Sequence, residues 1–188
     1  MTKLSQQLQR SLQLSTQEVK VAEDLFVPIK FDKGEILISD LSKNCHLYYI
    51  LEGYVRVYTL MDGKEVTQWI GSPNYFITDL STWIFNTPIK WTIEAITPVK
   101  AIYITQKNYH LLSSQVNNWL EKERFFIGHC FEQMEVRILE FLTLTAEQRY
   151  LSFFKQSGSL FNEVPHQYIA SMLGMSPETL SRLRNKTL

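Results

Sequence analysis

The chain has 188 residues, of which 45% are hydrophobic, and its 19 basic residues balance 19 acidic ones. This composition suits one larger folded domain with a smaller one and excludes a disordered chain, while the zero net charge excludes a non-specific nucleic-acid binder of strongly basic character. No apolar run approaches the ~20 residues of a membrane span and the N-terminal segment is polar, so we expect a cytoplasmic protein without a membrane partner.

Residues 4–25 carry the signals of a helix. Ser15 and Glu18 have the spacing of a capping box, and apolar residues then recur at intervals of three from Val19 onward. We interpret this segment as a lead-in helix that packs on the next domain.

From Phe26 the hydrophobic pattern changes to a period of two, which is typical of strands. Glycines at positions 34 and 53 interrupt the pattern, and the pair Asp62-Gly63 is a strong hairpin signal. Many short strands separated by turn residues predict an antiparallel barrel or roll. The predicted strands lie in FVPIKF (26–31), GEILISD (34–40), HLYYILEGYVRVYTL (46–60), KEVTQWI (64–70) and residues 89–104.

Aromatic residues gather in the segment 72–95, between the two groups of predicted strands. They either line a pocket for a small apolar or aromatic effector or fill the core of the roll. These residues are Tyr75, Phe76, Trp83, Phe85 and Trp91.

A long helix is predicted from residue 117 to residue 143, because apolar residues recur there at intervals of three, four and seven. Such a stripe either pairs with the same helix of a second chain or packs only on the chain's own roll. The stripe consists of Leu120, Ile127, Phe131, Met134, Ile138 and Phe141.

A break at residues 142–145 is the predicted hinge, because Thr145 and Gln148 form a second capping-box pattern and start a new helix. Its apolar residues are expected to hold the following helices. These residues are Tyr150, Leu151 and Phe154.

Residues 164–186 predict two short helices about a tight turn. Gly174 supplies the turn, Ser176 is a favourable N-cap, and Pro177 fits the first helical position. The apolar residues Ile169, Ala170, Leu173, Leu180 and Leu183 face inward, which leaves Glu178, Ser181, Arg182, Asn185 and Lys186 facing outward. A short helix with Arg, Asn and Lys on its outer face suits a DNA major groove, although any amphipathic helical hairpin shows a similar pattern.

A homodimer follows from this interpretation, because a two-fold protein lets one short recognition helix gain affinity on a palindromic site. An enzyme is not expected, since no nucleophile, base and orienting group occur together. Two distant cysteines, Cys45 and Cys130, form neither a metal motif nor a disulfide framework, and we expect reduced thiols. The four histidines show no ligand spacing, so no metal is expected.

The segment IASMLGMSPETLSRLRNK (169–186) resembles the helix-turn-helix of the Crp/Fnr family of bacterial transcription regulators. KGEIL (33–37) and ILEGYVRVY (50–58) resemble, more weakly, the early strands of that family's effector domain. The resemblance implies an α+β fold, with a cyclic-nucleotide-binding-like β-roll (1–116), a dimerisation helix (117–143) and a helix-turn-helix domain (144–188). Family members commonly continue beyond the recognition helix, whereas this chain stops at Leu188.

The same resemblance implies double-stranded DNA as the partner, with RNA polymerase as a further one. Glu178 and Arg182 occupy the principal base-reading positions, where we expect contacts to a cytosine amino group and a guanine edge. Ser181, Arg184 and Lys186 are expected on phosphates, and Asn185 completes the site. Pro177 departs from the Arg that cAMP-responsive members often carry before this Glu.

The phosphate cassette of cyclic-nucleotide-binding members also departs from the family pattern. Its Gly-Glu pair reads Thr78-Asp79 here, and the Arg that pairs with the cyclic phosphate falls at Ile89 or Lys90. Lysine does not make the bidentate contact of Arg, so cAMP is not expected as the effector. Phe76, Thr78, Asp79, Ile89 and Lys90 form the candidate effector pocket, and the absence of cysteines before Cys45 argues against an iron–sulfur cluster. The alternative function is a small-molecule-binding sensor module with weak or vestigial DNA binding.

Overall fold

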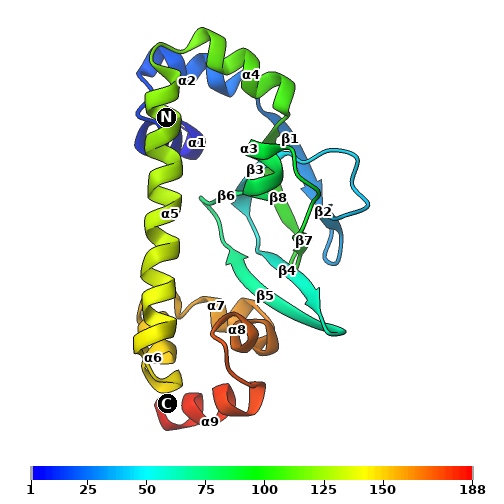
Figure 1. Ribbon diagram of the computed structural model, residues 1–188, viewed down its shortest axis with the longest axis vertical. Coiled ribbons are helices and arrows are strands. Elements are labelled where there is room, and N and C mark those ends of the chain that lie inside the picture. Colours follow the sequence, from blue (N-terminus) through cyan, green and yellow to red (C-terminus); the bar gives the residue numbers. More distant parts are fainter. Residues whose placement is uncertain (1, 188) are drawn as a thin grey trace.

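A computed structural model describes residues 2–187 as two β-sheets, a long helix and a C-terminal group of helices. Figure 1 shows the long helix α5 running along the molecule, with the N-terminal helices at one end and α9 at the other. The described helices are α1 (Lys3–Leu12), α2 (Thr16–Glu23), α3 (Leu80–Phe85), α4 (Gln106–Gln115), α5 (Trp119–Thr143), α6 (Ala146–Ser157), α7 (Leu160–Glu163), α8 (His166–Met172) and α9 (Pro177–Thr187). The strands are β1 (Val27–Phe31), β2 (Ile36–Ile38), β3 (Leu47–Glu52), β4 (Val55–Met61), β5 (Lys64–Gly71), β6 (Phe76–Ile77), β7 (Thr92–Ala95) and β8 (Val99–Ile104).

The strands form the predicted antiparallel roll. One sheet has the order β1-β8-β3-β6 and the other has the order β2-β7-β4-β5. The predicted hairpin at Asp62-Gly63 joins β4 and β5, which is an edge strand. The last predicted stretch begins later than expected, because residues 89–91 precede β7 as a loop. The α+β fold class with a roll, a long helix and a helix-turn-helix is therefore confirmed.

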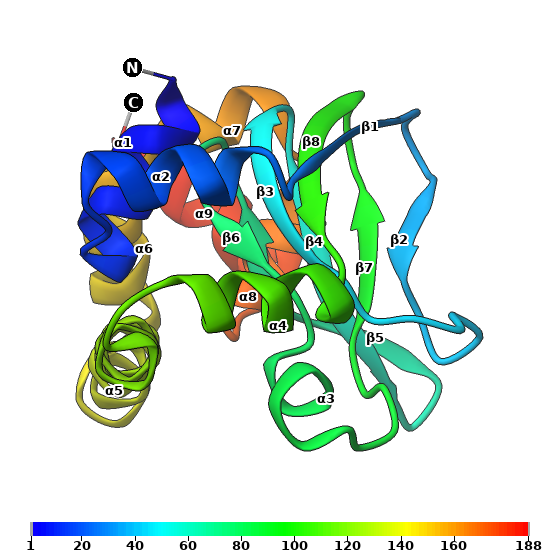
Figure 2. The same cartoon turned by 90° about the horizontal axis from the view of Figure 1, so that it is seen from above.

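The N-terminal segment forms two helices instead of the single lead-in helix that we predicted. The expected capping box is present at α2, where the Ser15 hydroxyl accepts from the Glu18 amide and the Glu18 carboxylate accepts from the Ser15 amide. A further capping box at Thr2 starts α1, so two caps divide the segment. Helix α1 packs against α2 and α5, α2 packs against α4, and α4 runs from the start of α5 toward the roll (Figure 2).

Three aromatic rings join the effector region of the roll to the long helix. Trp83 of α3 packs edge-on against Tyr109 of α4, which packs edge-on against Trp119 at the start of α5. Trp83 is buried, as the core-filling alternative predicts, whereas Phe85 is 71% exposed and points away from the core. The aromatic residues of this segment therefore do not act as one group.

The C-terminal helices share their core with the roll. Ile70 of β5 and Ile96, which follows β7, belong to the same buried cluster as Ile169, Leu173 and Leu180. Tyr150 and Phe154 of α6 contribute to this cluster as predicted, but the prediction for Leu151 is wrong, because it lies on the exposed side of α6 and Phe153 packs inward instead. Among the described residues, no helix combines the length and hydrophobicity needed to cross a bilayer.

Candidate nucleic-acid interface and effector site

The turn between α8 and α9 has the geometry of a helix-turn-helix. Gly174 has a φ of +65°, a conformation that favours glycine, and a Cβ at this position would lie 2.5 Å from the Phe141 ring. Ser176 caps α9 as predicted, since its hydroxyl oxygen accepts a 3.2 Å hydrogen bond from the Thr179 amide. Leu180 and Leu183 are buried, so α9 turns the opposite side to solvent.

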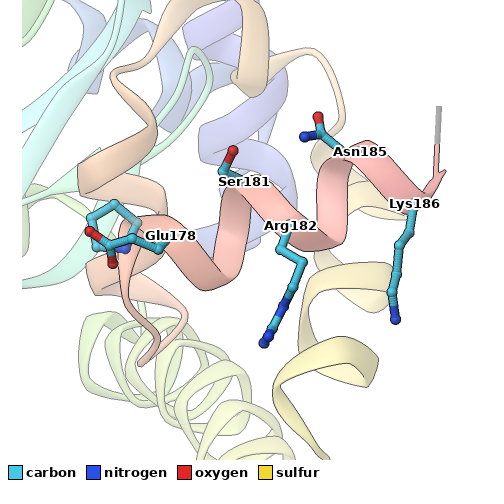
Figure 3. Close-up of a pocket in the computed structure, with 6 residues that line it drawn as sticks. Glu178, Ser181, Arg182, Asn185 and Lys186 are labelled. Atoms are coloured by element: carbon cyan, nitrogen blue, oxygen red, sulfur yellow. The ribbon is translucent and has the colours of Figure 1, made fainter.

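The outer face of α9 presents polar and charged side chains together. They line a shallow hollow of about 730 Å³ at the end of the molecule. Figure 3 shows Arg182 and Lys186 extending side by side, with Ser181 and Asn185 forming a second row. Ser181, Arg182, Asn185 and Lys186 make no side-chain hydrogen bond or ion pair with another described residue. The lining residues are Pro177, Glu178, Ser181, Arg182, Asn185 and Lys186.

Two of the predicted DNA-binding residues have local partners. A hydrogen bond with Ser176 lowers the pKa of Glu178, which therefore stays ionised as an acceptor at the start of the helix. Arg184 lies at the edge of the outer face and is half-buried, and its guanidinium is 2.9 Å from the Nε2 atom of His166. Arg184 is thus held beside α8, whereas Arg182 is exposed.

The candidate effector pocket is organised around the carboxylate of Asp79, which is fully buried. Its Oδ1 atom accepts from the Thr82 amide (3.2 Å) and the Ser81 hydroxyl (2.9 Å), and its Oδ2 atom accepts from the amides of Lys90 (2.8 Å) and Trp91 (3.2 Å). Burial alone would raise the pKa of Asp79, but the hydrogen bonds from Lys90 and Thr82 outweigh it and lower that pKa. Asp79 is therefore the N-cap of α3 and binds the loop that returns to β7.

The other predicted pocket residues have different contacts, in the roll and with α5. Thr78 contacts the buried thiol of Cys45, with 3.3 Å between Oγ1 and Sγ. Phe76 packs against Tyr49 and against Phe126 of α5. Lys90 contacts Asp79 through its backbone amide, and the residue is otherwise exposed. Ile89 packs on the core of the roll.

The role of Asp79 as an N-cap was missed in the sequence, although Asp immediately before an apolar helical segment is a recognised signal. The buried cation Arg56 was also missed. It lies in a strand at a position where a charged residue normally faces solvent, so the sequence contains no signal for its burial.

The long helix α5 leaves large apolar side chains exposed. Leu120 (80%), Phe131 (63%), Ile138 (54%) and Leu142 (78%) are separated by 11, 7 and 4 residues, which places them on one side of the helix. Ile127 and Met134 of the predicted stripe are half-buried. Phe141 leaves the stripe, because its ring packs on Gly174 and lies 4.9 Å from the Arg149 guanidinium carbon.

Both cysteines are free thiols, and burial raises the pKa of Cys45 and of Cys130. Within residues 2–187, no group of three His, Cys, Asp or Glu side chains is arranged to hold a metal ion. The thiols therefore have the environment of packing residues.

Comparison with known proteins agrees with this architecture. Residues 28–114 match the cyclic nucleotide-binding domain, which covers most of the roll. No curated protein matches the sequence. Similar solved structures include a CooA variant from Carboxydothermus hydrogenoformans (19% identity, TM-score 0.65, covering 96% of this chain and 82% of that one). The catabolite activator protein of Thermus thermophilus is also similar (16% identity, TM-score 0.58, covering 92% of this chain and 83% of that one). So is a Eubacterium rectale structure assigned to the Crp/Fnr family of transcriptional regulators (19% identity, TM-score 0.66, covering 93% of this chain and 83% of that one).

Proposed function

We propose that this chain, in which residues 28–114 match the cyclic nucleotide-binding domain, is a homodimeric, sequence-specific DNA-binding transcription regulator of the Crp/Fnr type. The outer face of α9 is the observation that carries the proposal. Ser181, Arg182, Asn185 and Lys186 expose donors without internal partners on a helix that lies at the end of the molecule, where neither the roll nor α5 covers it. Donors of this kind match base edges and phosphates in a major groove.

The roles are assigned from the exposure and chemistry of each side chain. Arg182 is exposed and is assigned to a guanine edge, and the ionised Glu178 is assigned to a cytosine amino group. Ser181 and Lys186 are assigned to phosphates and Asn185 completes the face. Arg184 contacts a phosphate from the edge of the face, where His166 holds it.

Dimerisation is proposed through α5. Four large apolar side chains on one side of a helix of 25 residues are costly to leave in water, and a second copy of the same stripe covers them. The two copies then present two α9 helices to the two halves of a palindromic site.

We further propose that the regulator does not respond to cAMP. The Asp79 carboxylate already occupies the amide donors at the start of α3 and in the loop before β7. A cyclic phosphate brought to the same place would meet a fixed negative charge and no arginine. Phe76, Thr78, Ile89 and Lys90 remain candidate contacts for a different small effector.

Selection of duplexes from a random library by the purified full chain tests this function. We expect enrichment of a palindromic sequence, and fluorescence anisotropy at one fixed salt concentration should show it bound at least ~10³-fold more tightly than a random duplex. The stoichiometry should be two chains per duplex, and Phe131→Glu should yield monomers in sedimentation experiments. Addition of cAMP should leave the affinity unchanged. Equal affinity for selected and random duplexes would refute the proposed function.

A further inference from the structure

The edge strand β5 offers backbone groups that other parts of the chain satisfy. Its pairing with β4 contains a bulge, because Val57 is opposite Trp69 whereas Tyr58 is opposite Thr67, which leaves Gln68 as the additional residue. The Thr67 amide donates a 2.9 Å hydrogen bond to the Ser171 hydroxyl of α8. The Gln68 carbonyl oxygen accepts from the Arg137 guanidinium of α5. The bulged part of β5 is therefore bound to both the helix-turn-helix and the long helix.

Arg137 connects three parts of the molecule. Besides the Gln68 carbonyl oxygen in the roll, it donates a 2.7 Å hydrogen bond to the carbonyl oxygen of Met172, the last residue of α8. Its guanidinium carbon also lies 5.4 Å from the centre of the Trp69 ring. Because a guanidinium is planar and presents its donors in a fixed geometry, these contacts restrict the orientation of α8 as well as its distance from α5.

Arg56 forms the second fixed contact between the roll and the helix-turn-helix. Within the roll it donates to Thr67 Oγ1 (2.8 Å) and to Glu65 Oε2 (2.5 Å), and its guanidinium carbon lies 4.3 Å from the centre of the Tyr58 ring. On the other side, the centre of the Tyr168 ring of α8 is 3.9 Å away, and Arg56 is only 2% exposed. A buried guanidinium between two rings is a directional contact, so it fixes how α8 lies on the sheet.

The two arginines are not the only contacts between the roll and the helix-turn-helix. Ile70 and Ile96 of the roll are also buried in the same cluster as Leu180 and Leu183. The covalent connection between α5 and α6 consists of Leu144 and Thr145 only. A two-residue connection by itself allows rotation, and rotation about it would change the distance between two α9 helices in a dimer.

We propose that Arg137 and Arg56, through Met172 and Tyr168, are positioning residues that set the half-site spacing of the operator. This inference rests on the proposed DNA-binding function. The geometry fixes α9 relative to α5. In the proposed dimer α5 lies beside the two-fold axis, so the contacts with the roll determine the separation of the two recognition helices. Neither arginine is assigned a DNA contact, because Arg56 is 2% exposed and the Arg137 guanidinium donates to the carbonyl oxygens of Gln68 and Met172.

The test compares the selected operator with versions that carry one or two additional base pairs between the half-sites. One base pair moves a half-site by about 3.4 Å and turns it by about 35°, so the wild-type chain should lose roughly 10- to 100-fold in affinity as one α9 loses its base contacts. For Arg137→Met and for Tyr168→Leu, this spacing penalty should be on the order of tenfold smaller. Lys100→Met is the control and should keep the wild-type penalty. It removes an exposed cation that pairs with Glu52, and both residues lie on the sheet that does not contain β5.

The spacing penalty distinguishes a positioning residue from one that only stabilises the fold. A variant that is only less stable loses affinity for all spacings alike, so the ratio of its affinities for two spacings stays at the wild-type value. An unchanged ratio in both folded variants, checked by circular dichroism, would overturn the inference while the DNA-binding function stands. The same holds if the wild-type chain shows no penalty. Failure to enrich any duplex would instead remove the proposed function and this inference with it.

Discussion

At the start of α3, a single carboxylate is surrounded by four donors from its own chain, whereas the outer face of α9 carries donors that no other described residue accepts from. Both regions are polar, and both were candidate sites in the sequence. Burial separates them, since Asp79 is fully buried and Arg182 is exposed. Buried polar groups require partners within the protein, while exposed charged groups are available to an external one. The cassette therefore has the chemistry of a structural element, and α9 has that of a binding surface.

The largest effect is expected from Asp79→Ala, which should destabilise the fold by about 3 kcal/mol, because it removes a helix cap and leaves the amides of Thr82, Lys90 and Trp91 without their acceptor. Urea denaturation followed by circular dichroism measures this loss. Asp40→Ala, at an exposed turn position, is the control and should change stability by less than about 0.5 kcal/mol. A similarly small change in Asp79→Ala would show that the carboxylate is not structural.

Arg182→Ala should show the opposite behaviour. Stability should stay within about 0.5 kcal/mol of the wild-type value, because the side chain has no internal partner. Affinity for the selected operator should fall by about 1–3 kcal/mol per half-site, with relaxed specificity at one base position. Lys186→Ala is the matched comparison, and anisotropy should show that it weakens selected and random duplexes alike and lowers the salt dependence. Equal losses on both duplexes for Arg182→Ala would contradict its base-reading role.

A smaller effect is expected on acidification. The pKa of Asp79 is lowered in the folded state, so its carboxylate contributes stability above the ordinary value of 3.8. As the pH falls below that value, Asp79 takes up a proton first in the unfolded chain. The stabilising contribution then decreases until the pH has passed the lower pKa of the folded state. The stability difference between wild type and Asp79→Asn should therefore shrink below about pH 4 in urea denaturation. If this stability difference stayed constant from pH 6 to pH 2.5, the lowered pKa of Asp79 in the folded state would be disproved.

Local signals in the sequence predicted much of this architecture. The capping boxes at Ser15 and Thr145 and the turn at Gly174 depend on neighbouring residues, and all three are present. The role of Asp79 depends on amides eleven and twelve residues away, which only the return of the loop brings close. Arg56 has the strand position of an exposed residue, yet it is buried beside Tyr168 of α8. Contacts between distant segments of the chain leave no local pattern.

The shared core also bears on how the chain folds during synthesis. The sequence divides into a roll and a helix-turn-helix at the end of α5, yet Ile70 and Ile96 complete the core of the C-terminal helices. The roll is made first by the ribosome, so the apolar surface that receives α8 and α9 is already in place when these helices emerge. Each half then exposes apolar residues when the other is missing, and the full chain should unfold in one cooperative transition. A cut at the sequence boundary would consequently divide one folding unit.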